Sequence, residues 1–311
     1  MSTAFYSHTD CRLHDMGEGH PECPQRLGAI DDFLYASGLD IALERIDAPL
    51  ADLKDLALAH TSRYVSELHE LLEQVEASGE RRMMDPDTVA NCGTWKAALR
   101  AAGAAVAATD AVIDGRFKNA FCAVRPPGHH ATRDAAMGFC FFNNVAVAVR
   151  HALDVRGLVR VAVVDFDVHH GNGTEDILAG DDRVLMVSFF QHPLYPDNGG
   201  VPMGTNMINL PIPAYTRGPE IRDLIEANWM PALESFRPQM LFISAGFDAH
   251  REDDLAQLGL VEADYEWITQ RVMGVAQRHA EGRIVSCLEG GYNLSALGRS
   301  VAAHVRALAG V

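Results

Sequence analysis

Five short apolar runs alternate along the chain with longer segments of helical spacing. The runs are continuous and rich in β-branched residues, which is typical of parallel strands buried on both faces; they cover residues 120–124, 159–164, 184–187, 240–244 and 283–288. The helical segments cover residues 94–113, 143–153, 219–236, 262–279 and 294–308. This alternation predicts an α/β fold with a mainly parallel sheet covered by helices on both faces.

The domain organisation follows from the length and from the lack of natural boundaries. A chain of 311 residues could hold two domains, but single α/β domains also reach this size. It contains no Pro/Ser-rich linker, low-complexity tract or internal repeat that would divide it. We therefore expect one domain that spans residues 1–311.

Composition and charge narrow the classes of partner and the location. The net charge is −16 without any Lys/Arg cluster, which argues against nucleic-acid binding and favours cationic partners. No stretch approaches the ~20 apolar residues that span a bilayer, so we expect no membrane association. The N-terminus lacks a secretory signal, and the six cysteines form no C-x-x-C pair. These features predict a cytoplasmic protein with free thiols and leave homo-oligomer formation open.

The segments that follow the predicted strands carry the candidate chemistry. They read RPPGHH after residues 120–124, DFDVHHGNGT after 159–164, AGFDAH after 240–244 and EGGYN after 283–288. Ligands of open parallel sheets bind beyond the carboxyl ends of the strands. We therefore expect these four segments to meet at one edge of the sheet.

A metal site is the simplest reading of the segment DFDVHH. Residues two apart on extended backbone share a face, so Asp165, Asp167 and His169 can point the same way, and Asp248 can add a ligand from another strand. Three protein ligands with one open position are typical of catalytic zinc. Carboxylate and imidazole donors also suit Fe(II). A single Asp is more often a helix cap, but the convergence of several strand ends argues against coincidence.

The same segments resemble a known family. RPPGHHA, GFCFFNNVAVA, VDFDVHHGNGT, SAGFDAH and LEGGYN, with HPECPQRL and HTSRYV upstream, resemble the histone deacetylase family, in the branch with class II enzymes and acetylpolyamine amidohydrolases. The resemblance runs from about residue 5 to residue 308. It implies an arginase/deacetylase-like open three-layer fold and zinc-dependent amide hydrolysis.

The resemblance also implies two cation sites. Asp167, His169 and Asp248 would be the zinc ligands. A structural potassium ion would be held by Asp165, by the backbone of Asp167 and His169, and by Ser188. A two-metal, arginase-like site would need more bridging acids, so one transition-metal ion is expected.

Catalytic roles carry over in the same way. His130 would be the general base and then the general acid, and His129 its electrostatic partner, oriented by Asp165. Tyr292 would hold the substrate carbonyl. Asn172 stands where class I members carry Asp, and a neutral amide stabilises a histidine cation less than a carboxylate does.

The substrate is the least determined part of this interpretation. Gly138, Phe139 and Tyr195 would line a narrow channel for an acylated alkyl-amine. We expect removal of acetyl or other acyl groups from Nε-acyl-lysine in peptides or proteins, with acetylated polyamines as the alternative substrate. Acids that could attract a cationic substrate, unless they form an ordinary solvated loop, are Glu18, Glu22, Glu252 and Asp253.

Overall fold

A single large sheet forms the centre of the protein, for which a computed structural model describes residues 2–311. Its strands are β1 Thr3–Ser7, β2 Leu43–Asp47, β5 Asn119–Cys122, β6 Val161–Asp165, β7 Val184–Gln191, β8 Met207–Ile212, β9 Leu241–Ala245 and β10 Ile284–Leu288. They lie in the order β2-β1-β5-β10-β9-β6-β7-β8, and every neighbouring pair is parallel. Two short strands, β3 Arg82–Met83 and β4 Val89–Ala90, form a separate antiparallel pair.

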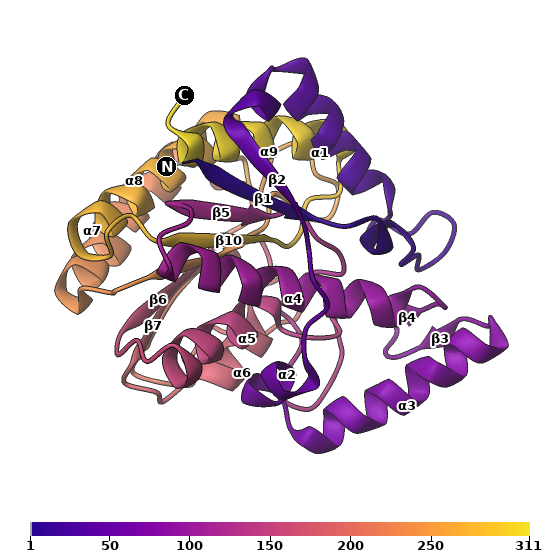
Figure 1. The fold of residues 1–311 in the computed structure, drawn as a ribbon. Coiled ribbons are helices and arrows are strands. Elements are labelled where there is room, and N and C mark those ends of the chain that lie inside the picture. The colour runs from indigo at the N-terminus through magenta and orange to yellow at the C-terminus, as the bar shows by residue number, and fades with distance from the viewer. Residues whose placement is uncertain (1) are drawn as a thin grey trace.

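Helices cover both faces of this sheet (Figure 1). One layer consists of α1 Gln25–Ala36, α7 Gly218–Phe236, α8 Glu262–His279 and α9 Leu294–Ala309. The other contains α2 Leu53–Ala59, α4 Thr94–Ile113, α5 Asn144–Arg150 with a π-helical extension at His151–Val155, and α6 Asn172–Leu178; α3 Ser62–Ser78 packs beside α2 and α4. The predicted three-layer α/β architecture is confirmed. Within residues 2–311 no helix is both long and apolar enough to cross a membrane.

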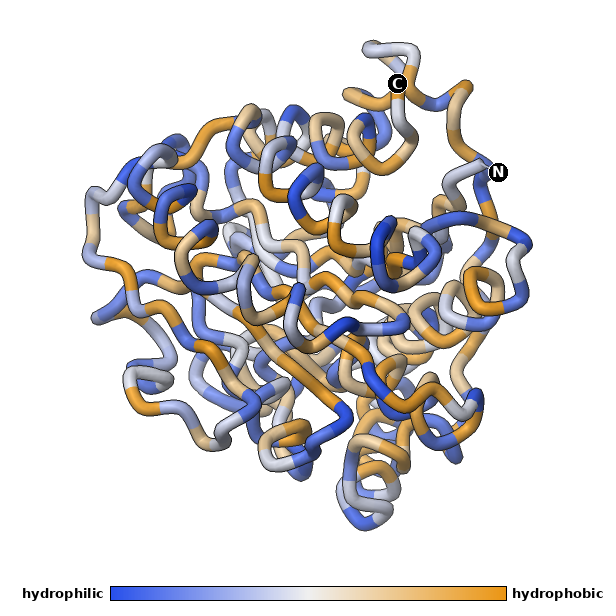
Figure 2. Tube along the Cα trace, turned by 90° about the vertical axis from the view of Figure 1, so that its left-hand side faces the viewer, coloured by the Kyte–Doolittle hydropathy of each residue, from blue (hydrophilic) through white to orange (hydrophobic). Residues whose placement is uncertain are grey.

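The continuous apolar runs are explained by complete burial of the central strands. Every residue of β6, β7, β9 and β10 is buried. Figure 2 shows hydrophobic segments through the middle of the molecule and hydrophilic ones mostly in the outer turns. Burial of one Val, Leu or Ile side chain stabilises the fold by about 1.5–3 kcal/mol, so these strands dominate the core.

The predicted elements are found with modest shifts in their bounds. The run at 159–164 forms β6 Val161–Asp165, and α4 and α8 have the predicted bounds. The inner strand β1 and the two edge strands β2 and β8 were not predicted. The edge strands read LERID and MINLPI and contain polar residues or a proline, because an edge strand is only partly covered and one side of it needs no hydrogen bonds.

Register brings the ends of four adjacent strands to one level. Cys122 of β5 lies opposite Cys287 of β10, Cys287 lies opposite Ser244 of β9, and Ser244 lies opposite Asp165 of β6. The segment DFDVHH starts in this row at Asp165, and AGFDAH, EGGYN and RPPGHH start one to three residues beyond it. The sheet therefore brings these four segments together at its carboxyl edge, although they lie far apart in the sequence.

Candidate active site

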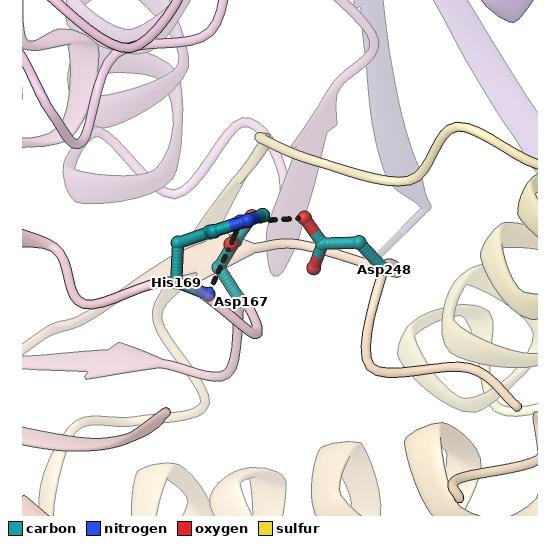
Figure 3. A group of neighbouring side chains, drawn as sticks. All are labelled: Asp167, His169 and Asp248. Carbon is teal, nitrogen blue, oxygen red and sulfur yellow. Dashed lines mark hydrogen bonds and ion pairs between the residues drawn. The ribbon is translucent and has the colours of Figure 1, made fainter. Parts of the chain in front are cut away.

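Asp167, His169 and Asp248 meet beyond the carboxyl ends of β6 and β9 (Figure 3). Nδ1 of His169 lies 3.1 Å from Oδ1 of Asp167 and 3.2 Å from Oδ2 of Asp248. The N–H of Gly290 donates to the other oxygen of Asp167 at 2.8 Å, and the N–H of Val168 donates to Oδ1 of Asp248 at 2.9 Å. Backbone groups thus orient both carboxylates toward the imidazole.

The donor set of this cluster fits a divalent metal ion. The three side chains are buried, and one possible ligand atom from each lies within 4.8 Å of the others. Burial opposes a charge on His169, but hydrogen bonds to Asp167 and Asp248 outweigh it and raise its pKa to about 10. The field therefore favours a positive charge beside Nδ1, which a divalent cation would provide in place of the proton. Two carboxylates and one imidazole suit zinc or Fe(II).

Two glycines make room for these carboxylates. A Cβ atom on Gly290 would lie 2.0 Å from Oδ2 of Asp248 and 2.6 Å from Oδ2 of Asp167, and a Cβ atom on Gly246 would lie 2.0 Å from Oδ2 of Asp167. No larger residue fits either position without displacing a carboxylate. The glycines of AGFDAH and EGGYN are therefore needed for the shape of the cluster.

His129 lies beside the cluster in a strongly acidic environment. Its Nδ1 is 3.1 Å from Oδ2 of Asp165, and its Nε2 is 3.8 Å from Oδ1 of Asp167. Burial opposes protonation, but the charges of Asp167 and Asp165 overcome it and raise the pKa of His129 to about 10. These two carboxylates favour the protonated form of His129. The structure brings together His129 and Asp165, the pair expected from the sequence.

His130 is in the opposite state. Burial, followed by the positive charges of His129 and His169, lowers its pKa well below the ordinary value. Its Nδ1 lies 2.7 Å from Oδ1 of Asn172, an acceptor, so the proton of the neutral ring belongs on Nδ1 and the lone pair on Nε2. Gly138, at φ +55°, packs against this ring, and a Cβ atom there would lie 2.5 Å from Cδ2 of His130.

A pocket of about 230 Å³ opens above these residues. It is lined by Asp87, His130, Gly138, Phe139, His169, Leu194, Tyr195, Leu255 and Tyr292. The three predicted channel residues all lie in this wall. Asp87, Leu194 and Leu255 were not predicted, because none of them belongs to a chemically distinctive segment.

Tyr292 forms part of the pocket wall. Its ring packs edge to face on Phe139 with 5.8 Å between centroids. Its N–H donates to Oδ2 of Asp253 at 2.6 Å. Burial and the charge of Asp248 raise the pKa of the Tyr292 phenol well above its ordinary value, so the hydroxyl keeps its proton as a hydrogen-bond donor.

The predicted potassium contacts lie at the end of β6, in the loop that follows it and in the neighbouring strand β7. Asp165 and Ser188 are opposite residues of β6 and β7. The N–H of Asp167 donates to Oδ1 of Asp165 at 3.1 Å, and the hydroxyl of Ser188 bonds to Oδ1 of Asn209 at 3.3 Å. Potassium binding at Asp165, Asp167, His169 and Ser188 stays a prediction.

The expectation of a solvated acidic rim was wrong for two of its four members. Glu22 is completely buried, and so is nearly all of Asp253, which binds the N–H groups of Tyr292 and Asn293. Glu18 and Glu252 are exposed. Glu22 and Asp253 bind residues that are distant in the sequence, so the polar residues next to them in the chain did not indicate their burial.

Glu289 is a site residue that the sequence did not single out. Its carboxylate accepts hydrogen bonds from the N–H groups of Gly128 at 2.6 Å and His129 at 3.1 Å, and from the hydroxyl of Ser244 at 3.1 Å. Burial raises its pKa to about 7. The only available signal was its position just before two glycines at a strand end. It holds the histidine loop in place.

Known proteins are similar to this chain over nearly its whole length. Residues 20–308 match the family model of the histone deacetylase domain. A probable deacetylase of Archaeoglobus fulgidus is 37% identical over 303 residues, covering 94% of this chain and 82% of the relative. A histone deacetylase-like amidohydrolase of Pseudomonas aeruginosa is 38% identical over 282 residues, covering 88% and 73%. The crystal structure of the HDA15 HD domain aligns with a TM-score of 0.93 at 33% identity, covering 100% of this chain and 89% of that one.

Proposed function

This chain belongs to the histone deacetylase family, and from that premise we propose that it is a zinc-dependent deacylase of Nε-acyl-lysine in peptides or proteins. The observation that carries the proposal is one pocket, lined by His130, His169 and Tyr292, where three elements meet. They are the buried cluster Asp167, His169 and Asp248, a histidine pair that faces Asp165 on one side and Asn172 on the other, and the side chain of Tyr292.

Asp167, His169 and Asp248 would hold the metal ion, with Fe(II) as the alternative to zinc. Zinc held there would supply Lewis acidity, which makes water a nucleophile near neutral pH and polarises the acyl carbonyl. The buried setting strengthens the field of the two carboxylates, because little solvent screens it. A structural potassium ion near Asp165 and Ser188 would balance part of the remaining negative charge.

His130 is suited to take and return one proton. Its lone pair is on Nε2, so Nε2 would accept the proton of the attacking water, a contribution of typically 10²–10⁴-fold. The cation that results is destabilised by burial and by the neighbouring His129 cation. His130 would therefore pass the proton readily to the departing amine. Asn172 keeps the tautomer correct at Nδ1 throughout.

Tyr292 would donate its hydroxyl hydrogen to the carbonyl oxygen as negative charge develops there. Loss of one such donor costs about 3–4 kcal/mol in comparable sites. Phe139 and Tyr195 line the channel and would enclose the alkyl chain of the substrate. Exclusion of water by these walls would strengthen each polar contact at the base of the pocket.

Acetylated polyamines remain the second candidate because Asp87 contributes a carboxylate to the pocket wall. The test is a comparison of kcat/KM for an acetyl-lysine peptide and for N-acetylputrescine, each with and without a chelator. We expect chelator-sensitive hydrolysis with preference for the peptide. A large preference for the polyamine would assign acetylated polyamines as the substrate in place of acyl-lysine. Activity that persists after complete metal removal would reject the mechanism.

A further inference from the structure

A buried carboxylate lies between two arginines behind the pocket. Oε1 of Glu22 accepts hydrogen bonds from Nη1 of Arg26 at 3.0 Å and from Nε of Arg125, and Oε2 accepts one from Nη2 of Arg125 at 2.7 Å. All three side chains have no exposed surface. The pKa of Glu22 falls to about 2, because the charges of Arg125 and Arg26 outweigh the burial that opposes ionisation. The cluster is thus one anion shared by two cations.

Arg26 connects Glu22 to the loop that contains Tyr292. Its Nε donates to the carbonyl of Gly291 at 2.7 Å, and its Nη2 donates to the carbonyl of Glu289 at 2.5 Å. The guanidinium carbon lies 5.1 Å from the centroid of the Tyr292 ring. Arg26 therefore holds both the backbone before Tyr292 and the face of its ring.

Arg125 connects Glu22 to the loop that contains His129 and His130, called the histidine loop. It stands directly before Pro126 and Pro127, and its Nη1 donates to the carbonyls of Cys11 at 2.8 Å and His14 at 3.0 Å. The histidine loop has a second anchor of its own, since Glu289 binds the N–H groups that follow these prolines. Loss of Glu22 should consequently disturb the tyrosine loop more than the histidine loop.

Stability alone does not account for such a cluster. Replacing a buried ion pair by apolar residues of similar volume is often neutral or stabilising, because desolvation of the charges is costly. The geometry points instead to Glu22 as a positioning residue that, through Arg26, fixes Tyr292 relative to His130. This inference rests on the proposed deacylase function and adds a residue outside the pocket to it.

The test compares the wild type with Glu22→Gln, which is close to isosteric but uncharged. We expect kcat to fall at least tenfold with KM within about threefold, because a misplacement of 1 Å can cost ~100-fold in rate. Asp264→Asn is the matched control: Asp264 is buried and paired with Arg222 at the start of α8, and it does not line the pocket. It should lower the melting temperature and leave kcat unchanged.

A double-mutant cycle separates positioning from general damage. If Glu22 acts through the hydroxyl of Tyr292, Glu22→Gln should cost less than about threefold when added to Tyr292→Phe, since coupled residues are not additive. Losses that multiply fully in the double variant would overturn the inference. Should Glu22→Gln fail to fold, Arg26→Lys tests the same link, because an ammonium group cannot hold two carbonyls and the carboxylate in the same fork.

Two further outcomes keep this inference distinct from the proposed function. Active wild type with an unchanged Glu22→Gln variant would overturn the positioning role and leave the function intact. A wild type that is inactive on every acylated substrate would reject the function. In that case a crystal structure of Glu22→Gln still decides: a displaced Tyr292 ring supports the inference, and an unmoved ring overturns it.

Discussion

The substitution Gly290→Ala tests the metal site by a steric effect alone. The new methyl group would start 2.0 Å from Oδ2 of Asp248 and 2.6 Å from Oδ2 of Asp167, whereas ordinary contacts begin at 3.4 Å. The carboxylate of Asp248 would have to retreat by about 1.4 Å, the difference between these contact distances. No charge, hydrogen-bond donor or proposed metal ligand is removed by this change.

The expected effect on metal affinity is large. Metal–ligand distances in proteins tolerate only about ±0.2 Å, so a shift of this size moves at least one carboxylate out of coordination range. Removing a group that merely orients a ligand costs ~10–100-fold in affinity. Displacing a ligand itself should cost ~100-fold or more, and activity should fall with metal content.

The assay is a competition titration of zinc against a chromophoric chelator, with circular dichroism to verify that the variant is folded. Gly200→Ala is the control, because a Cβ atom there meets only Nε2 of His192 at 3.9 Å. It should bind zinc as the wild type does. Wild-type zinc affinity in folded Gly290→Ala would refute the assignment of Asp167 and Asp248 as ligands.

Two further predictions concern histidines. His130→Ala should lower kcat by ~10²–10⁴-fold and leave the metal content unchanged by elemental analysis; normal turnover would reject its role as base. Burial lowers the pKa values of His14 and His60 to about 4 and of His304 to about 3. The unfolded chain takes up these protons below pH 6.5 and the folded chain does not, so the three histidines should lower the free energy of unfolding on acidification by up to ~4 kcal/mol per pH unit. Glu289 and Asp248, whose pKa values burial raises to about 7, take up protons in the folded chain over the same range and offset part of this loss. Urea unfolding between pH 7 and pH 5 measures the slope, and a pH-independent free energy of unfolding would contradict it.

Much of the fold was predictable because the central strands are buried on both faces. β6, β9 and β10 appear in the sequence as unbroken apolar runs, and each ends in a polar, glycine-rich segment. The edge strands β2 and β8 are partly exposed and carry no such run. Pattern reasoning therefore found five central strands and missed both edge strands and β1, the inner strand beside β2.

The candidate site was predictable where its residues follow strands directly. Asp167, His169 and Asp248 come at strand ends, and the register of the sheet brings them together. Glu22 illustrates the opposite case, because its partner Arg125 lies 103 residues away and only the fold reveals their contact. Asp87 enters the pocket wall from a loop with no periodic signal.

Protonation states also lay beyond sequence reasoning. His129 and His130 are adjacent in the chain, yet the first faces Asp165 and Asp167 and the second faces the amide of Asn172. Their pKa values consequently move in opposite directions. The sequence indicated a proton-transfer pair only through a family resemblance, and the three-dimensional neighbours supply the physical reason.

The most direct test of this account is anomalous diffraction at the zinc edge from crystals grown with zinc. We predict one strong peak bounded by Asp167, His169 and Asp248, at about 2.0–2.2 Å from an atom of each. A fully occupied zinc site elsewhere in the protein, with no peak among these three side chains, would contradict the account.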